Sequence, residues 1–219
     1  MDNKTSLFIV SDVHGCYHTF NEIAGKWNRE KEIFIQIGDL IDRGNFSPLV
    51  VKKARELYDE GAIFLKGNHE LMACRFLKTS DMNVWFRNGG NKTYVQYKET
   101  KRSLYQDVVW FMNMPLKWEN EHIHISHAGI SHTSNPYEES NTDGVLWTKN
   151  KLKNINKLQI VGHTFQKKGK PVFEKETNTL FIETGACYGK NMCALRMDFT
   201  GKILETILVP VVKTDLPKS

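Results

Sequence analysis

Residues 33–44 of the chain read Ile-Phe-Ile-Gln-Ile-Gly-Asp-Leu-Ile-Asp-Arg-Gly. The first five residues form a mostly apolar run, which indicates a buried β-strand that ends at Gly38-Asp39. Two further apolar runs, at residues 7–10 and 62–65, also end just before glycine and polar residues. The sequence therefore predicts three buried strands whose carboxyl ends carry polar loops.

The segments between these strands have helical spacing. Residues 17–28 and 48–60 place apolar side chains three and four positions apart, and Gly61 follows the second segment. A strand-helix-strand-helix-strand order is typical of a parallel sheet with crossover helices, so we expect an α/β fold. Residues 70–114 have a mostly helical pattern, which is broken at Gly89-Gly90.

The second half of the chain predicts further strands. Residues 122–126 and 158–161 form two of them, with a polar loop at 131–143 between. Four short alternating runs in residues 171–209 are typical of antiparallel strands. We expect one domain at residues 1–209 and a flexible basic tail at residues 210–219.

The composition is that of a globular protein. The chain has 219 residues, of which 40% are hydrophobic and 25% charged, so disorder and coiled coil are poor interpretations. No segment approaches the roughly 18 apolar residues of a membrane span, and the first residues lack a secretory signal pattern. The four cysteines include no CxxC pair. We therefore expect a cytoplasmic protein with reduced thiols and no membrane partner.

The net charge of +5 favours anionic substrates. The lysines are scattered along the chain rather than gathered in one block, so no specific nucleic acid partner is expected.

Five predicted strands are each followed by Asp, Asn or His next to a glycine. Sites in open α/β sheets form at the carboxyl ends of strands, so these loops can converge on one point. The five segments are Asp12-Val13-His14-Gly15, Gly38-Asp39 through Gly44, Gly67-Asn68-His69-Glu70, His127-Ala128-Gly129 and Gly162-His163-Thr164.

The side chains of this set are nitrogen and oxygen ligands without a thiolate. Such ligands suit Mn, Fe, Zn or Ni rather than a structural zinc site. There are too many for one metal that keeps an open position, whereas two metals that share a carboxylate accommodate them all. Bimetal sites are suited to in-line displacement at phosphorus.

Each segment alone has an ordinary structural explanation. A single aspartate can cap a turn or a helix, Glu70 can favour a helix N-terminus, and a lone histidine can be a buried core residue. The combination of all five, each after an apolar run, favours the metal site.

These motifs, in this order, resemble the signature of the calcineurin-like metallophosphoesterases. The intact Gly-Asp-Leu-Ile-Asp-Arg-Gly and Gly-Asn-His-Glu are similar to the phosphoprotein phosphatase branch. Residues 85–90, 145–147, 162–164 and 180–189 resemble its bacteriophage lambda type. The resemblance covers residues 7–199 and implies two mixed β-sheets packed as a sandwich, with helices on both outer faces.

The resemblance also implies a role for each motif residue. Two divalent ions are implied, with Mn expected and Fe, Zn and Ni as alternatives, and a hydroxide that bridges them would attack the phosphorus. His69 would be the general acid, Asp42 would orient it, and Arg43 would bind phosphate oxygens. The implied ligands are Asp12, His14 and Asp39 for the first metal, and Asp39, Asn68, His127 and His163 for the second, with Asp39 as the bridge.

The chain departs from the lambda type at two positions, where Lys66 and Lys149 stand in place of arginine. Lysine keeps the charge but loses the two-pronged grip on phosphate. Both are candidates for phosphate contacts, although Lys66 could instead form a structural ion pair and Lys149 could begin a solvated basic run. Cys16 is interpreted as a packing residue rather than a nucleophile.

The function that the resemblance implies is a metal-dependent phosphatase of phosphoserine and phosphothreonine in proteins or peptides, with phosphotyrosine and phosphohistidine as further substrates. A dinucleoside polyphosphate hydrolase is the main alternative, but Asp42-Arg43, which is often altered in such enzymes, is intact here. Trp85, Phe86 and Trp110 could stack on a base or belong to the core. A binding module without metals, and a nuclease or cyclic-nucleotide phosphodiesterase, are weaker alternatives.

Overall fold

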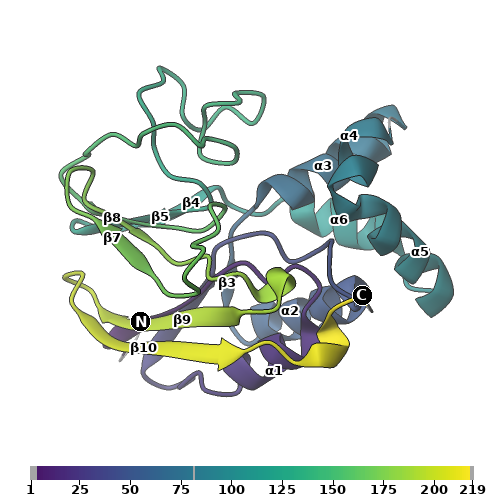
Figure 1. Ribbon diagram of the computed structural model, residues 1–219, viewed down its shortest axis with the longest axis horizontal. Helices are drawn as coiled ribbons and strands as arrows, with labels where there is room; N and C mark the ends of the chain where they lie inside the picture. Colours follow the sequence, from purple (N-terminus) through teal and green to yellow (C-terminus); the bar gives the residue numbers. More distant parts are fainter. Residues whose placement is uncertain (1–3, 81, 218–219) are drawn as a thin grey trace.

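The computed structural model describes residues 4–80 and 82–217 and contains two five-stranded mixed sheets (Figure 1). In the first sheet, β1, β2 and β3 run parallel, as predicted, and Ile9 of β1 pairs with Ile35 of β2. The strand order is β10-β9-β1-β2-β3, with β1 at Ser6–Val10, β2 at Glu32–Gln36, β3 at Ile63–Phe64, β9 at Asn191–Asp198 and β10 at Ile203–Pro210.

The second sheet has the order β4-β5-β6-β8-β7. Its strands are β4 (Lys117–Glu119), β5 (Ile123–Ser126), β6 (Leu158–Val161), β7 (Val172–Glu174) and β8 (Thr179–Phe181). The antiparallel runs predicted in residues 171–209 form the pairs β7–β8 and β9–β10, but these pairs belong to different sheets and β8 is parallel to β6. The short strand β4 was not predicted.

Two helices, α1 (Tyr17–Ala24) and α2 (Ser47–Asp59), lie against the outer face of the first sheet (Figure 1). The predicted helical segment 70–114 forms α3 (Asn68–Thr79), α4 (Asn83–Trp85), α5 (Asn91–Thr100) and α6 (Leu104–Met112). A π-helical turn at Phe86–Gly90, with Gly89 at φ 104°, gives the predicted break. Within the described ranges, no helix is long and apolar enough to cross a membrane.

Both faces of β1 and β2 in the first sheet are buried. Leu7, Ile9 and Ile35 face the second sheet, where they pack with Ile125 and Ile160. Alternate residues such as Phe8 and Phe34 pack instead against the helices. Burial on both faces explains why these strands read as continuous apolar runs rather than alternating ones.

The two packed mixed sheets with their helices confirm the predicted fold class, and on the outer face of the second sheet a long loop lies where helices were expected (Figure 1). Residues 127–157 contain no helix, and this long loop covers the face instead. The strands present buried polar side chains here, and these bind the loop: Gln159 accepts a hydrogen bond from the Ile130 N–H at 2.9 Å and donates to the Lys153 carbonyl at 2.8 Å. The polar side chains on this face provide hydrogen-bond partners for backbone N–H and C=O groups of the loop, which an apolar face could not provide.

The prediction of a flexible C-terminal tail is wrong for residues 210–217. Asp215 is fully buried, and its carboxylate accepts hydrogen bonds from the His18 N–H (2.9 Å), the Thr19 N–H (2.9 Å) and the Thr19 hydroxyl (2.7 Å). It lies in a short 3₁₀ turn, Lys213–Asp215, against the first turn of α1. Residues 218 and 219 of the predicted tail, and residues 1–3 and 81 of the predicted domain, lie outside the described residues.

We expect Asp215→Ala to destabilise the protein, because the substitution leaves two N–H groups and a hydroxyl without their acceptor. The loss should be about 1–3 kcal/mol in the free energy of unfolding, measured by urea denaturation. Lys213→Ala, an exposed change in the same turn, is the control and should be neutral. Equal stability of both variants would contradict the anchoring role of Asp215.

Candidate metal centre

The five motif loops meet at one edge of the sheet sandwich, as predicted. The loops after β1, β2 and β3 come from the first sheet, and those after β5 and β6 come from the second. Hydrogen bonds join the two sheets at this edge. Asp12 Oδ2 accepts from the His163 N–H at 3.0 Å, and His127 Nδ1 lies 3.0 Å from the Ile37 carbonyl oxygen.

Asp39 stands at the centre of the buried polar side chains. Its Oδ2 atom lies 3.4 Å from His14 Nε2 and 3.4 Å from His127 Nε2. Two groups of potential ligands share this carboxylate: His14, Asp39 and His69 form one, and Asp39, His127 and His163 form the other. Shared membership in both groups is the geometry expected of a bridging carboxylate.

Of the remaining predicted ligands, Asn68 adjoins the second group and Asp12 lies beside His163, while the first group contains His69 rather than Asp12. Asn68 Oδ1 lies 2.9 Å from His127 Nε2 and 3.1 Å from His163 Nδ1. Two buried atoms, Asp12 Oδ1 and His163 Nε2, have no hydrogen-bond partner among the described residues. Buried polar atoms without a partner are costly, and nitrogen and oxygen donors suit divalent cations. The residues present therefore fit two divalent ions.

Charge and burial favour the neutral, metal-binding form of two histidines. Burial and the Arg43 guanidinium lower the pKa of His14 well below its usual value, and burial together with His127 lowers the pKa of His163 to about 3. For His127, burial alone would lower the pKa, but the Asp39 carboxylate outweighs it and the pKa rises to about 9. Binding of a cation by His127 would therefore release a proton.

The backbone at the site is strained. His14, Asp39, Asp42, Arg43 and His163 all have positive φ angles, between 47° and 74°. L-residues rarely adopt this region, and such outliers gather at functional sites. Next to His163, a Cβ atom at position 162 would lie 2.0 Å from Asp12 Oδ1, so only glycine fits there.

Asp42 and His69 form the pair that the resemblance implied. His69 Nδ1 lies 2.6 Å from Asp42 Oδ2, and Trp85 donates its indole N–H to the same oxygen at 2.9 Å. Trp85 is buried, so the option that it stacks on a base is wrong; it fixes Asp42 from the core. Phe86 packs on Phe76, and Trp110 packs on Phe64.

A cavity of about 320 Å³ opens beside the candidate metal centre. It is lined by the predicted phosphate ligand Arg43, the predicted acid His69, and the exposed Lys149 at its rim. The other lining residues are Asn68, Asn88, Trp147, His163, Thr164, Phe165, Glu183 and Tyr188.

Lys66 does not line this cavity, which corrects its place among the predicted substrate contacts. Its ammonium group is buried between the Glu139 carboxylate (2.5 Å) and the Met112 carbonyl oxygen (3.0 Å). The structural ion pair is therefore the better interpretation of Lys66. Cys16 is buried as well, and all four cysteines are unpaired.

Sequence reasoning missed other residues of the site. Glu70, considered only as a helix-start residue, accepts hydrogen bonds from Asp39 and Leu40 of another loop. Glu183, Phe165 and Tyr188 line the cavity, yet only the place of Glu183 and Tyr188 in a family-like stretch drew attention to them.

Comparison with known proteins agrees with this geometry. The family described as calcineurin-like phosphoesterase matches residues 5–185. Serine/threonine-protein phosphatase 1 of Salmonella typhimurium is 24% identical over 212 residues, covering 89% of this chain and 93% of that protein. The bis(5'-nucleosyl)-tetraphosphatase PrpE [asymmetrical] of Bacillus subtilis is 26% identical over 241 residues, covering 92% and 93%.

A solved structure shows the same fold. A protein serine/threonine phosphatase from Saccharomyces cerevisiae has a TM-score of 0.65 at 15% identity, covering 96% of this chain and 81% of that one. The match over most of the chain and the paired ligand groups around Asp39 lead to one conclusion: the protein belongs to the calcineurin-like phosphoesterase family.

Proposed function

We propose that the protein is a metal-dependent phosphatase that hydrolyses phosphoserine and phosphothreonine in proteins or peptides. The observation that carries the proposal is the intact Asp42–His69 hydrogen bond of 2.6 Å with the Arg43 guanidinium beside it, 3.0 Å from His69 Nε2. This places a proton donor and a phosphate-binding group at the same cavity. The serine/threonine phosphatase relatives support the same substrate class.

Arg43 is the group we expect to hold the substrate phosphate. Its guanidinium is a donor only, so His14 Nε2 (2.6 Å) and His69 Nε2 (3.0 Å) act as acceptors in this conformation. Phosphate oxygens are stronger acceptors than a neutral imidazole and can be bound two at a time. A bound phosphate therefore draws Arg43 away from His69 and frees its Nε2 atom.

His69 is the group we expect to protonate the leaving oxygen. Asp42 holds Nδ1, which leaves Nε2 directed at the cavity. Burial alone would lower the pKa of His69, but the nearby Asp39 and Asp42 carboxylates raise it. Once Arg43 no longer donates to Nε2, that atom can carry the proton, which the ring gives to a serine or threonine oxygen as the ester bond breaks.

The residues proposed to hold the two divalent ions are Asp12, His14, Asp39, Asn68, His127 and His163, with Mn as the expected metal and Fe, Zn and Ni as alternatives. When bound, the ions supply Lewis acidity at the phosphoryl oxygens and a water nucleophile active at neutral pH. The chain itself fixes the site through Asp39 and keeps it buried at the edge of both sheets.

Hydrolysis of dinucleoside polyphosphates is the second candidate, because relatives of similar identity carry that name. One experiment separates the two. The purified protein, supplied with Mn, is offered a phosphoserine peptide, p-nitrophenyl phosphate and diadenosine tetraphosphate side by side. The proposal requires the peptide to have the higher kcat/KM, and a preference for the dinucleotide would overturn it.

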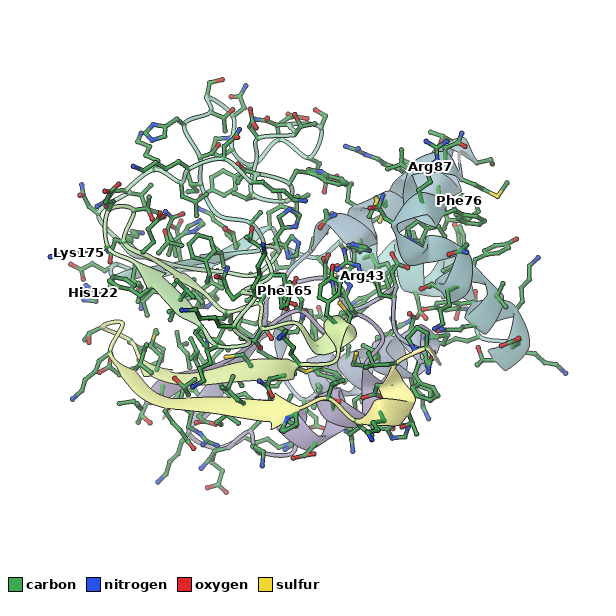
Figure 2. The ribbon with its side chains drawn as sticks, viewed as in Figure 1. Arg43, Phe76, Arg87, His122, Phe165 and Lys175 are labelled. Atoms are coloured by element: carbon green, nitrogen blue, oxygen red, sulfur yellow. The ribbon has the colours of Figure 1, made fainter. Side chains whose placement is uncertain are left out.

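The first prediction from this site concerns the ligands. Asp39→Asn or His127→Ala should lose bound metal and activity together, because each substitution removes a ligand that no neighbour replaces. Metal content measured by mass spectrometry decides the matter, with His122→Ala, an exposed histidine at the far end of the molecule, as the control (Figure 2). Full metal occupancy in both site variants would show that the ligand assignment is wrong.

The second concerns His69. His69→Asn should lower kcat on a phosphoserine peptide by about 10²–10⁴-fold, the usual contribution of acid–base catalysis, while the metal content stays unchanged. The loss should be smaller on p-nitrophenyl phosphate, because nitrophenolate leaves without a proton. Equal losses on the two substrates would mean that His69 does not protonate the leaving group.

The third concerns Lys149 at the rim of the cavity. If it binds the phosphate, Lys149→Ala should lower kcat/KM by roughly tenfold, the effect of one charge-assisted hydrogen bond. Lys149→Arg should match or exceed the parent protein, since arginine can bind two oxygens. Lys151→Ala is the matched control, because Lys151 is exposed and pairs with Glu176. If all three variants stay within about twofold of the parent, Lys149 is only a solvated surface residue.

A further inference from the structure

Two aromatic rings form one wall of the cavity that holds Arg43 and His69. The rings of Phe165 and Tyr188 lie with their centroids 4.8 Å apart and their planes 34° from parallel. Phe165 comes from the loop after β6, and Tyr188 ends the short 3₁₀ turn Ala186–Tyr188. Figure 2 shows Phe165 close to Arg43 near the centre of the molecule. None of the aromatic residues considered from the sequence as base-stacking groups contributes to this wall.

The backbone at Gly185 leaves room for the ring of Phe165. Gly185 has a φ angle of 88°, and a Cβ atom there would lie 2.2 Å from the Cε2 atom of Phe165. Gly185 is in turn held by the buried Glu183, whose Oε1 accepts its N–H at 2.9 Å. Phe165 therefore packs against Gly185, whose backbone conformation is one that L-residues avoid. The neighbouring Tyr188 is 54% exposed.

The wall begins close to the expected position of the phosphate. The guanidinium carbon of Arg43 lies 5.7 Å from the centroid of the Tyr188 ring. An aromatic ring attached next to the phosphoryl group would lie within reach of both Arg43 and this ring. In phosphotyrosine the ring is attached directly to the ester oxygen, whereas a nucleobase is separated from its nearest phosphate by a ribose, and phosphoserine offers only a methylene group.

We propose that Phe165 and Tyr188 form a binding face for an aromatic leaving group, so that the site binds phosphotyrosine more tightly than phosphoserine. This inference rests on the proposed phosphatase function and refines its substrate class. Offset aromatic contacts add to simple burial, and the expected effect of losing one ring is roughly a three- to tenfold weaker binding of the aryl group.

The test must separate binding from leaving-group chemistry, because aryl esters react faster than alkyl esters whatever the protein recognises. Benzylphosphonate and ethylphosphonate are stable to hydrolysis and carry a methylene in place of the ester oxygen of an aryl and an alkyl phosphate. Their inhibition constants against p-nitrophenyl phosphate give a selectivity ratio for the Mn-loaded protein. We expect benzylphosphonate to bind several-fold more tightly, which an equal affinity for the two compounds would overturn.

Four variants then locate the selectivity. Phe165→Leu and Tyr188→Leu should each lower the ratio roughly three- to tenfold, because leucine keeps an apolar side chain but removes the ring. Tyr188→Phe keeps the ring and should keep the ratio. Phe173→Leu is the matched control: Phe173 is also 54% exposed but lies on β7, outside this cavity. Equal ratios in the parent protein and both wall variants would overturn the inference.

The outcomes distinguish this inference from the function on which it rests. No hydrolysis of any phosphopeptide or of p-nitrophenyl phosphate would refute the proposed phosphatase itself. Hydrolysis with an unchanged selectivity ratio in the wall variants would refute only the aromatic face. If the wall variants instead lose hydrolysis of diadenosine tetraphosphate while their benzylphosphonate affinity is unchanged, the rings bind a base and the inference is wrong.

Discussion

The carboxylate of Glu70 is the interaction on which the rest of the site depends. Its Oε2 atom accepts the N–H groups of Asp39 (2.8 Å) and Gly67 (2.9 Å), and its Oε1 atom accepts the N–H of Leu40 (2.8 Å). One buried side chain thereby ties the loop after β2 to the start of α3. The Asp39 Oδ1 atom completes the joint by accepting the His69 N–H at 3.0 Å. The shared carboxylate and the expected proton donor consequently have a fixed relation to each other.

The packing of the two sheets supplies the other half of the site. His127 and His163 follow strands of the second sheet and reach Asp39 only because the apolar faces of β1 and β2 pack on β5 and β6. The Nδ1 atom of His127 also contacts the carbonyl oxygen of Ile37, the residue that follows β2. The position of His127 in the site therefore depends on how the two sheets are aligned. A change in the core between the sheets would shift these histidines relative to Asp39, even though no core residue touches substrate.

The sequence predicted features that depend on neighbours in the chain and missed those that depend on distant partners. The apolar run before Gly38-Asp39 was sufficient for β2, and the family resemblance identified the Asp42–His69 pair that the structure shows. Asp215, by contrast, accepts hydrogen bonds from residues 18 and 19, which are distant in the sequence. The composition of the last residues therefore predicted a flexible tail, although Asp215 attaches this segment to α1. The ion pair of Lys66 with Glu139 and the contact of Phe165 with Tyr188 likewise join segments whose spacing carries no local signal.

Buried polar atoms without a hydrogen-bond partner lower the stability of the fold, and in the part of the chain that the structure describes most of them lie near the cavity. Six buried side-chain atoms in the described residues have no hydrogen-bond partner, and four of them belong to Asp12, Asp42, His163 and Glu183 at or beside the cavity. Positive φ angles are concentrated in the same loops. Each such feature typically costs about 1–3 kcal/mol, which only a large core can offset. The apolar clusters on both sides of β1 and β2 supply that core. They therefore explain how a small protein can hold a strained cluster of polar side chains that can bind anionic ligands and cations, although some of their atoms have no hydrogen-bond partner among the described residues.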